Sequence, residues 1–322
     1  MFELLLSPIA IAAGCVLLFL GGEMLVSAST FIANRIGMST IAIGATVVAI
    51  GTSAPEFSVS FGAALNGYTN VSVGNVVGSN VCNIILVLGL CGLFCRLRAS
   101  RQIYVLDFPV LIVVSGLFTW MVRDRLITHL EGLILAAGLV GYVVWNLRRA
   151  AEDKQVEEFL TGEVAEALGE DTEHWLRPTL KAVGGIFSLA LGAKWLVEGS
   201  LDALAPLELS EAAVGATVVA LGTSLPEIGT SIIATRKGQG DLAVGNAIGS
   251  CVFNLLGVLG ITASIHPLPT PDVSLLDGAL LMAVSLAGLV LLARPGGIAR
   301  PQGIVLVSTY LLYLVGEVAF QG

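Results

Sequence analysis

A 47-residue segment occurs twice in this chain, with a constant offset of 171 residues and no gap. The first copy covers residues 44–90, the second covers residues 215–261, and 24 of the 47 positions are identical. Each copy carries one glutamate, Glu56 or Glu227, inside an apolar stretch of membrane-spanning length. A carboxylate at hydrocarbon depth costs about 2.5–3.5 kcal/mol on insertion scales. Two of them at matched positions predict a shared functional site as well as a duplicated fold.

Apolar stretches recur along the whole chain, which is typical of a polytopic membrane protein. Of the 322 residues, 55% are hydrophobic and 12% are charged, about half the charged fraction of a soluble domain. A helix of about 20 residues crosses the hydrocarbon core, so the pattern predicts an all-α membrane protein with ten transmembrane helices. The expected spans are residues 8–33, 40–65, 71–95, 103–122, 126–147, 180–203, 211–235, 242–264, 274–293 and 302–319. The first is expected to be a true span rather than a cleaved signal peptide, because no basic region precedes it.

The basic residues predict an orientation in the cell membrane. When the loops are assigned alternately to two sides, 13 of the 16 Lys and Arg residues fall on one side. Basic loops prefer the cytoplasm, so both termini are expected outside and the acidic loop 151–177 inside. Each half then has five spans, an odd number, so the halves enter the membrane from opposite sides. We therefore expect two inverted five-helix repeats, residues 1–150 and 178–322, joined by a cytoplasmic linker, and no basic surface for nucleic acid.

Each glutamate ends the motif G-T-S-x-P-E, at residues 51–56 and 222–227. Proline has no N–H and clashes with the carbonyl four residues back, so the helix is expected to break there. Carbonyls freed by the break are expected near four residues: Ala49, Thr52, Ala220 and Thr223. At membrane depth such groups are tolerated where they line a cavity or bind a cation. With the glutamate they form an all-oxygen site, which suits hard cations such as Ca2+ or Na+.

The following span in each copy carries a polar strip with the pattern G-N-x-x-G-S-x-x-x-N. Its polar residues are spaced four apart and so share one helical face. They are Asn75, Ser79 and Asn83 in the first copy and Asn246, Ser250 and Asn254 in the second. The glycines of the pattern allow close helix approach, which is expected to bring the strip to the glutamate. A single such motif usually marks only a kink, but two inverted copies with a glutamate each favour a cation site.

Two further features have simpler alternatives. Glu23 and Lys194 are separated by the same offset of 171 residues, and we expect them to pair across the axis between the repeats; the alternative is that each reaches water separately. The five cysteines all lie in expected spans and do not form a disulfide framework. Cys91 and Cys95 are one turn apart and are a remote candidate for a metal site, with helix packing as the simpler interpretation.

The two motifs resemble the alpha-repeats of the cation/Ca2+ exchanger superfamily, particularly the Na+/Ca2+ exchanger branch and its small prokaryotic members. Gly-Thr-Ser stands where the proton-coupled branch typically has Gly-Asn, which favours the sodium-coupled branch. The resemblance implies a central Ca2+ site built on Glu56, Glu227 and the carbonyls of Thr52 and Thr223, with Asn83 and Asn254 beside it. It also implies flanking Na+ sites formed by the carbonyls of Ala49 and Ala220 and the hydroxyls of Ser53, Ser79, Ser224 and Ser250.

The function that this resemblance implies is antiport of Ca2+ against Na+ by alternating access, with spans one and six as the sliding elements. No resident cofactor is expected, the ions and the lipid bilayer are the expected partners, and a monomer is expected to suffice. Some family members have an aspartate where this chain has Asn254, so the site has two carboxylates, which balance one Ca2+ or two Na+. Ca2+/H+ antiport is the alternative, because buried glutamates also bind protons. A cation channel would not need an inverted duplication, and no catalytic arrangement within the spans favours an enzyme.

Overall fold

The computed structural model describes residues 2–35, 49–101, 103–150, 175–236, 238 and 240–320. These residues are almost entirely helical. The helices of the first half are α1 (Phe2–Arg35), α3 (Ala49–Thr52), α4 (Ala54–Leu65), α5 (Thr69–Val81), α6 (Leu88–Phe94), α7 (Phe108–Met121) and α8 (His129–Ala150). Those of the second half are α10 (Leu176–Leu204), α11 (Glu211–Val214), α12 (Ala220–Thr223), α13 (Leu225–Arg236), α14 (Gly240–Phe253), α15 (Gly260–Ile265), α16 (Leu275–Ala293) and α17 (Arg300–Phe320).

Short segments of other geometry connect or extend these helices. Four π-helical segments lie at Cys82–Val87, Ile103–Asp107, Gly215–Val219 and Asn254–Leu259. Two 3-10 turns lie at Val122–Asp124 and Ala205–Leu207, and the strands β1 (Leu126–Ile127) and β2 (Leu268–Pro269) form an antiparallel pair. The π-helical segments are continuous with neighbouring α-helices, so α5 to α6 and α14 to α15 are each one membrane-length helix.

Nine of the ten expected spans have a helical counterpart. Among the described residues, eight helices are long and apolar enough to cross a membrane, and a pair bent by 46° at Ser224 adds a ninth. The nine agree with the expected spans to within a few residues. The tenth, expected at 40–65, falls partly outside the described residues and is described from Ala49 onward as α3 and α4. The chain is therefore a multi-pass helical membrane protein, and a count of ten spans stays a prediction.

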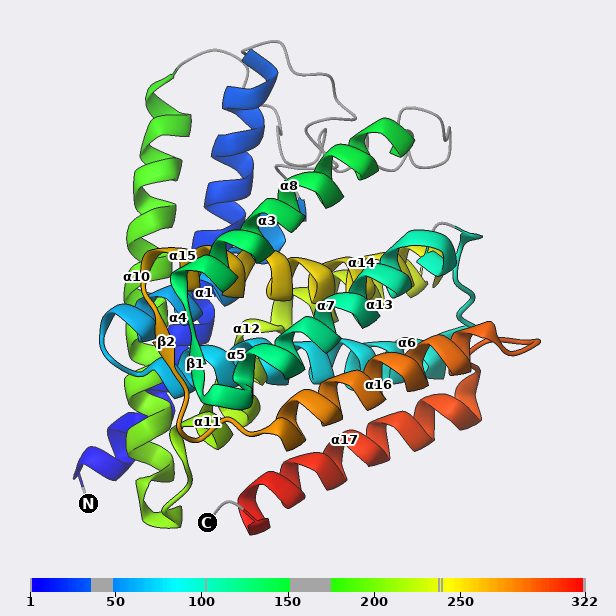
Figure 1. The fold of residues 1–322 in the computed structure, drawn as a ribbon. Coiled ribbons are helices and arrows are strands. Elements are labelled where there is room, and N and C mark those ends of the chain that lie inside the picture. The colour runs from blue at the N-terminus through cyan, green and yellow to red at the C-terminus, as the bar shows by residue number, and fades with distance from the viewer. Residues whose placement is uncertain are drawn as a thin grey trace.

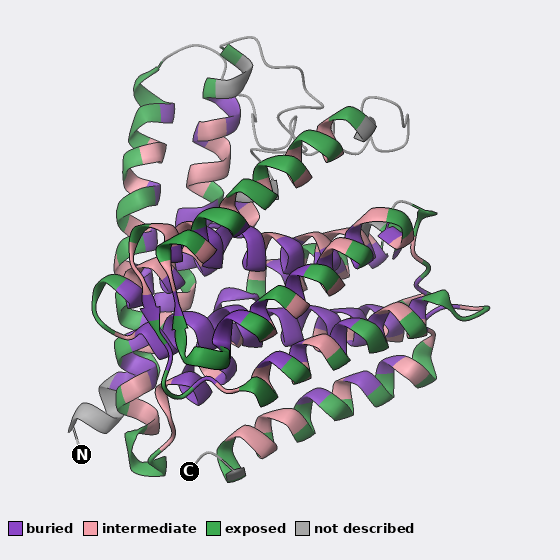
Figure 2. Ribbon diagram, in the orientation of Figure 1, coloured by how far each residue is buried: buried purple, intermediate pink, exposed green. Residues whose placement is uncertain are grey.

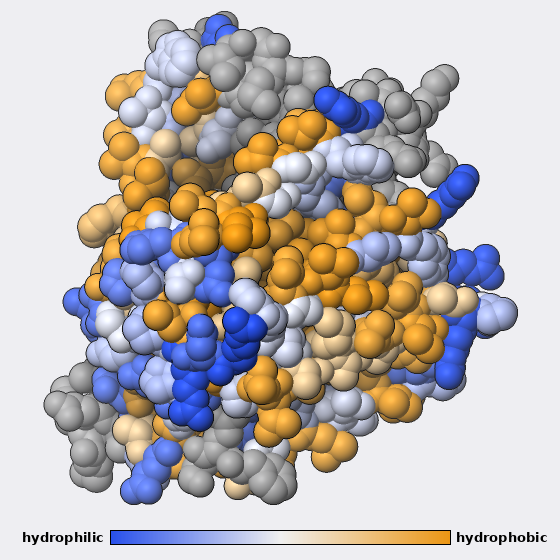
Figure 3. Space-filling model, viewed as in Figure 1, coloured by the Kyte–Doolittle hydropathy of each residue, from blue (hydrophilic) through white to orange (hydrophobic). Residues whose placement is uncertain are grey.

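Two long helices cross a stack of shorter ones. α1 and α10 stand side by side and cross the roughly parallel helices α5 to α7, α14, α16 and α17 (Figure 1). Buried residues concentrate in the middle of this stack, and every residue of α5 is buried (Figure 2). Hydrophobic side chains form a broad field over the middle of the surface, with hydrophilic ones gathered toward its edges (Figure 3). Such an apolar surface is what a protein surrounded by lipid requires.

The backbones of α1 and α10 touch at two pairs of glycines. A Cβ added to Gly14 would lie 2.9 Å from the Gly192 carbonyl oxygen, and one added to Gly21 would lie 2.9 Å from the Gly185 carbonyl oxygen. The two contacts exchange under the repeat offset of 171, because Gly14 matches Gly185 and Gly21 matches Gly192. Contacts that exchange in this way are expected of two halves related by a two-fold axis.

Backbone bridges between loops follow the same rule. Leu97 and Ile298 form one bridge, with N–H to O distances of 2.8 and 3.1 Å, and Ile127 pairs with Leu268 in the β1–β2 sheet. Under the offset, Leu97 matches Leu268 and Ile127 matches Ile298. The two bridges are therefore images of each other, although the loops that form them share little sequence.

Residues that touch their own counterparts mark where the axis lies. Ser188 Oγ donates to the Leu17 carbonyl at 2.7 Å, and Cys251 Sγ donates to the Asn80 carbonyl at 3.7 Å. The members of each pair are 171 residues apart. A residue contacts its two-fold mate only on the axis, so this axis passes between α1 and α10 at one point and between α5 and α14 at another.

The expected pairing of Glu23 with Lys194 is wrong. Glu23 is exposed, and Lys194 Nζ lies 3.9 Å from Glu198 Oε1, one turn along α10. The reason is the register of the crossing. The antiparallel α1 and α10 meet at Leu17 and Ser188, so Glu23 and Lys194 each lie six residues beyond it, about 9 Å to opposite sides along the helix axes.

Candidate functional site

Both G-T-S-x-P-E motifs break their helices at the serine. α3 ends at Thr52 and α4 begins at Ala54, while Ser53 has φ −90° and ψ 12°. The second copy repeats this geometry, with φ −83° and ψ 5° at Ser224 between α12 and α13. Pro55 lies in the first turn of α4, where a missing N–H does no harm. The expected breaks are confirmed, and each places its glutamate in the first turn of the following helix, where the helix dipole favours a negative charge.

The breaks bring the two glutamates together in the interior. The side chains of Glu56 and Glu227 are 1% and 0% exposed, and their carboxyl groups are close enough to repel each other when both are ionised. Ser224 Oγ of the second copy lies 3.5 Å from Glu56 Oε1 of the first. A buried pair of carboxylates needs bound cations or protons to be stable.

The polar strip of the first copy reaches across to the second. Thr223 Oγ1 donates to Asn75 Oδ1 at 3.1 Å, and Ser79 Oγ lies 3.4 Å from Thr223 Oγ1. Asn75 Nδ2 donates to Ser60 Oγ at 2.9 Å and also lies 3.4 Å from the Glu56 carbonyl oxygen. Residues of both copies therefore build one connected polar site.

Ser60 and Ser231 belong to this site although neither sequence motif predicted them. Asn246 Nδ2 donates to Ser231 Oγ at 2.9 Å, the same bond at the same distance that Asn75 makes to Ser60. Both serines are completely buried. Their signal in the sequence is that Ser60 and Ser231 are identical at matched positions four residues after each glutamate.

Several buried polar atoms around the carboxylates have no hydrogen-bond partner within the described part of the chain. They are Ser53 Oγ, Glu56 Oε2, both carboxylate oxygens of Glu227, and both amide atoms of Asn83 and Asn254. Each such group costs about 1–3 kcal/mol when it stays unsatisfied. Asn83 and Asn254 lie in or at the start of π-helical segments, a geometry frequent at functional sites. Unsatisfied oxygens clustered at matched positions fit a site whose ligands are cations.

The carbonyl at Ala220 differs from expectation. It accepts hydrogen bonds from Ser224 N at 3.0 Å and from Thr223 Oγ1 at 3.1 Å, so the break does not free it. The physical reason is that the turn from Ala220 to Thr223 is intact. The donor lost to the break is the missing N–H of Pro226, whose helical acceptor is the carbonyl of Gly222.

The remaining predicted residues have varied surroundings. Thr223 is completely buried, Ser250 is buried, and Thr52 is half-buried and makes an interaction of its own. For Ala49 the structure describes the helical backbone but not the surroundings of the side chain. Cys91 is buried and Cys95 half-buried, and within the described ranges no three His, Cys, Asp or Glu side chains form a metal-binding group.

The helices that carry the two glutamates are covered unequally. In α4, Val59 is completely buried in a cluster with Leu189, Ala193 and other residues of α10. Its counterpart in α13 is Thr230, which is exposed and accepts a hydrogen bond from Asn246 Nδ2 at 3.2 Å. An exposed polar pair at membrane depth is tolerated where it meets water rather than lipid.

Comparison with known proteins places this architecture. The family model described as sodium/calcium exchanger protein matches residues 6–148 and 179–318. The putative antiporter CaxA of Alkalimonas amylolytica is 34% identical over 96% of this chain and 98% of its own. The sodium/calcium exchanger MaX1 of Methanosarcina acetivorans is 28% identical over 94% and 95%. A solved structure of the sodium-calcium exchanger NCX_Mj, soaked with zero Na+ and Ca2+, is 27% identical, covers 97% of this chain and 99% of its own, and superposes with a TM-score of 0.62.

Proposed function

This chain belongs to the sodium/calcium exchanger family, and we propose that it is a secondary antiporter that exchanges Ca2+ for Na+ across the membrane. The observation that carries the proposal is the buried carboxylate pair, Glu56 and Glu227, surrounded by oxygen atoms without hydrogen-bond partners among the described residues. Carboxylates and neutral oxygens are the ligands that Ca2+ and Na+ prefer. Two carboxylates neutralise one Ca2+ or two Na+, so the two ions compete for one site.

The central Ca2+ site is proposed to consist of Glu56, Glu227 and the carbonyls of Thr52 and Thr223, with Asn83 and Asn254 beside it. The flanking Na+ sites are proposed at the hydroxyls of Ser53, Ser79, Ser224 and Ser250 and at the carbonyls of Ala49 and Ala220. At Ala220 a sodium ion has to displace the Thr223 hydroxyl, which now donates to that carbonyl. The break at Ser53 supports its place in this set, because its buried hydroxyl has no hydrogen-bond partner within the described residues.

The architecture proposed for this function is ten transmembrane helices arranged as two inverted five-helix repeats, residues 1–150 and 178–322, joined by a linker at 151–177. The exchanging glycine contacts, the exchanging loop bridges and the paired counterparts support it. Both termini are proposed to lie outside the cytoplasm. The Leu97–Ile298 bridge supports this orientation, because it joins two arginine-bearing loops on one face.

Alternating access is the proposed mechanism, with α1 and α10 moving together across the other helices. Their glycine contacts let the two backbones pack as one unit. In the present arrangement α10 covers Val59 beside Glu56, whereas Thr230 beside Glu227 is exposed. Movement of the α1–α10 pair toward α13 would cover Thr230 and uncover Val59, which exposes the carboxylates to one side of the membrane at a time. A monomer contains every element that this movement needs.

Ion uptake into proteoliposomes tests the function. Ca2+ uptake is expected when an outward Na+ gradient is imposed and not when a pH gradient is imposed alone. Glu56→Gln and Glu227→Gln are each expected to abolish uptake, because each removes one of the two charges that balance Ca2+. Uptake driven equally well by a pH gradient would replace Na+ with H+ as the counter-ion. Near-normal uptake by either variant would overturn the site.

A further inference from the structure

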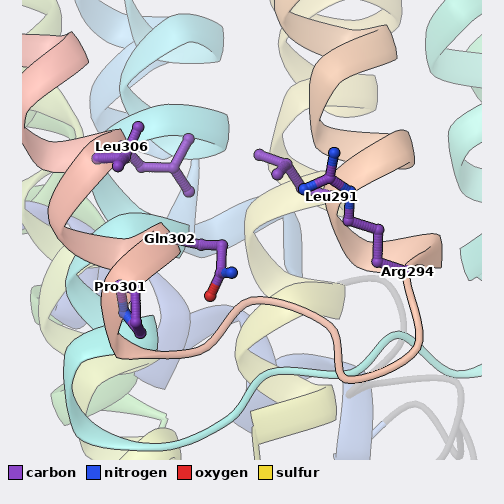
Figure 4. A pocket seen from close by; sticks show the side chains of 6 residues that line it. Leu291, Arg294, Pro301, Gln302 and Leu306 are labelled. Carbon is purple, nitrogen blue, oxygen red and sulfur yellow. The ribbon is translucent and has the colours of Figure 1, made fainter.

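A hollow of about 290 Å³ opens between the end of α16 and the beginning of α17. It is lined by Leu291, Arg294, Pro301, Gln302, Val305 and Leu306. Leu291 and Leu306 lie deeper along the two helices, whereas Arg294 and Gln302 lie near the connecting loop (Figure 4). The hollow thus has an apolar end at membrane depth and a polar end at the membrane surface.

Both polar side chains point into the hollow and have donors to spare. The Arg294 guanidinium and the Gln302 amide reach toward the space between α16 and α17 (Figure 4). Gln302 Oε1 accepts from Ala299 N at 3.2 Å, which directs the remaining amide N–H groups away from that bond. In the described ranges, no carboxylate lies within ion-pair distance of Arg294. The polar end therefore offers N–H donors and positive charge to an anion.

The loop bridge concentrates further arginines at this end. The bond between Leu97 and Ile298 holds the two loops together, and Arg96 Cζ lies 4.0 Å from the Cβ position of Gly296. Residues 95–102 and 294–302 contain no acidic residue and five arginines: Arg96, Arg98, Arg101, Arg294 and Arg300. The acidic residue nearest in the packing is Asp241, next to Gly240, which packs against Cys95 and Leu97.

The opposite face provides an internal comparison, because the Ile127–Leu268 pairing is the two-fold image of this bridge. Its loops, residues 122–129 and 265–274, carry two arginines and two aspartates, so they have no excess charge apart from histidine. Arg123 there is occupied, with Cζ 3.9 Å from the Trp120 ring centroid. The bridge geometry therefore does not require arginines, and their excess on one face has a separate cause.

We propose that the hollow between α16 and α17 binds an anionic phospholipid such as phosphatidylglycerol. One acyl chain lies against Leu291, Val305 and Leu306, and the phosphate is held by Arg294 and Gln302 with Arg300 nearby. Basic pockets between transmembrane helices recognise anionic headgroups, and each basic residue near the surface contributes about 1 kcal/mol. A soluble anion would not use the aliphatic half of the hollow, whereas a phospholipid uses both halves.

Native mass spectrometry of the purified full-length chain tests this proposal, and its result is independent of which ions are transported. The protein is titrated with phosphatidylglycerol and, separately, with phosphatidylcholine. The wild type is expected to retain at least one phosphatidylglycerol at a concentration at which phosphatidylcholine is lost. The double variant Arg294→Gln/Arg300→Gln is expected to need about tenfold more phosphatidylglycerol, the equivalent of about 1.4 kcal/mol. The charge-matched control Arg123→Gln/Arg125→Gln, on the opposite face, is expected to bind like the wild type.

A second variant tests the acyl seat without changing charge. Val305→Trp fills the apolar end of the hollow from an exposed helix position, so it is expected to weaken phosphatidylglycerol retention while thermal unfolding stays at the wild-type temperature. Equal retention of phosphatidylglycerol by the wild type, the arginine variant and the control would overturn the proposal. Loss in the arginine variant together with full retention in Val305→Trp would overturn the groove and leave only attraction to the surface.

Discussion

Replacing Gly192 by alanine probes the contact that holds α1 against α10. The added Cβ would lie 2.9 Å from the Gly14 carbonyl oxygen and 2.9 Å from the Leu18 nitrogen. Ordinary contact begins at 3.4 Å, so the two backbones have to separate by 3.4 − 2.9 = 0.5 Å. Both obstacles are backbone atoms, which no side-chain rotation moves. The strain is therefore carried by the whole α1–α10 interface.

The magnitude follows from two opposing effects. Overpacking of a well-packed contact typically costs about 1–3 kcal/mol, while alanine in place of glycine in a helix interior gains about 1 kcal/mol. Gly141→Ala in α8 is the matched control, because a Cβ there meets nothing within 4 Å and gains only the helix propensity. Gly192→Ala is expected to be about 1–3 kcal/mol less stable than Gly141→Ala.

The two-fold relation adds a stricter requirement. Gly21 is the counterpart of Gly192, and its Cβ would lie 2.9 Å from the Gly185 carbonyl oxygen and 2.9 Å from the Leu189 nitrogen. Gly21→Ala and Gly192→Ala are therefore expected to lower the unfolding temperature of the purified protein equally, as followed by tryptophan fluorescence. If either variant unfolds at the temperature of Gly141→Ala, or if only one of the two is destabilised, a symmetric contact between α1 and α10 is refuted.

Three further predictions concern the site and its surroundings. Asn254→Asp adds a third carboxylate, so KM for Ca2+ is expected to fall by about tenfold, or about 1.4 kcal/mol, with slower turnover in an uptake assay; an unchanged KM would separate Asn254 from the ion. Thr230→Val, which installs the residue of the first copy, is expected to slow uptake several-fold by removing a polar group from the water-exposed flank of Glu227, whereas Val59→Thr in the closed flank is expected to leave uptake unchanged; the reverse order would assign the open flank to α4. Tyr142→Phe removes the 2.9 Å hydrogen bond to buried Asp107, so it is expected to destabilise the fold by about 1–3 kcal/mol in thermal unfolding with KM for Ca2+ unchanged, and a changed KM would place Asp107 in the ion site.

Local chemistry made the site predictable. The proline of each G-T-S-x-P-E motif removes one backbone donor, so the break at Ser53 and Ser224 follows from covalent structure alone. The repeat then assigns equivalent roles to Glu56 and Glu227 before any fold is known. The polar strip was predictable for the same reason, because a spacing of four residues fixes a helical face.

Tertiary register was not predictable in this way. The offset of 171 makes Glu23 and Lys194 equivalent, but equivalence implies contact only on the axis, and the axis passes Leu17 and Ser188 instead. The hydrogen bonds at the Ala220 carbonyl depend on how the Thr223 side chain rotates. The loop bridge at Leu97 and Ile298 depends on both halves being folded. None of these features leaves a periodic signal in the sequence.

The buried carboxylate pair also accounts for exchange rather than leak. Two unit charges 4 Å apart repel by about 4 kcal/mol at an effective dielectric constant near 20, and burial of each charge adds a desolvation penalty. Since 1.4 kcal/mol corresponds to a factor of ten, repulsion alone lowers the population of an empty, occluded site by about a thousandfold. Glu56 and Glu227 are almost completely buried, so the protein passes between its two open states mainly with cations bound. Return without a cation is suppressed, and each Ca2+ that leaves one side is replaced by counter-ions carried back to the other.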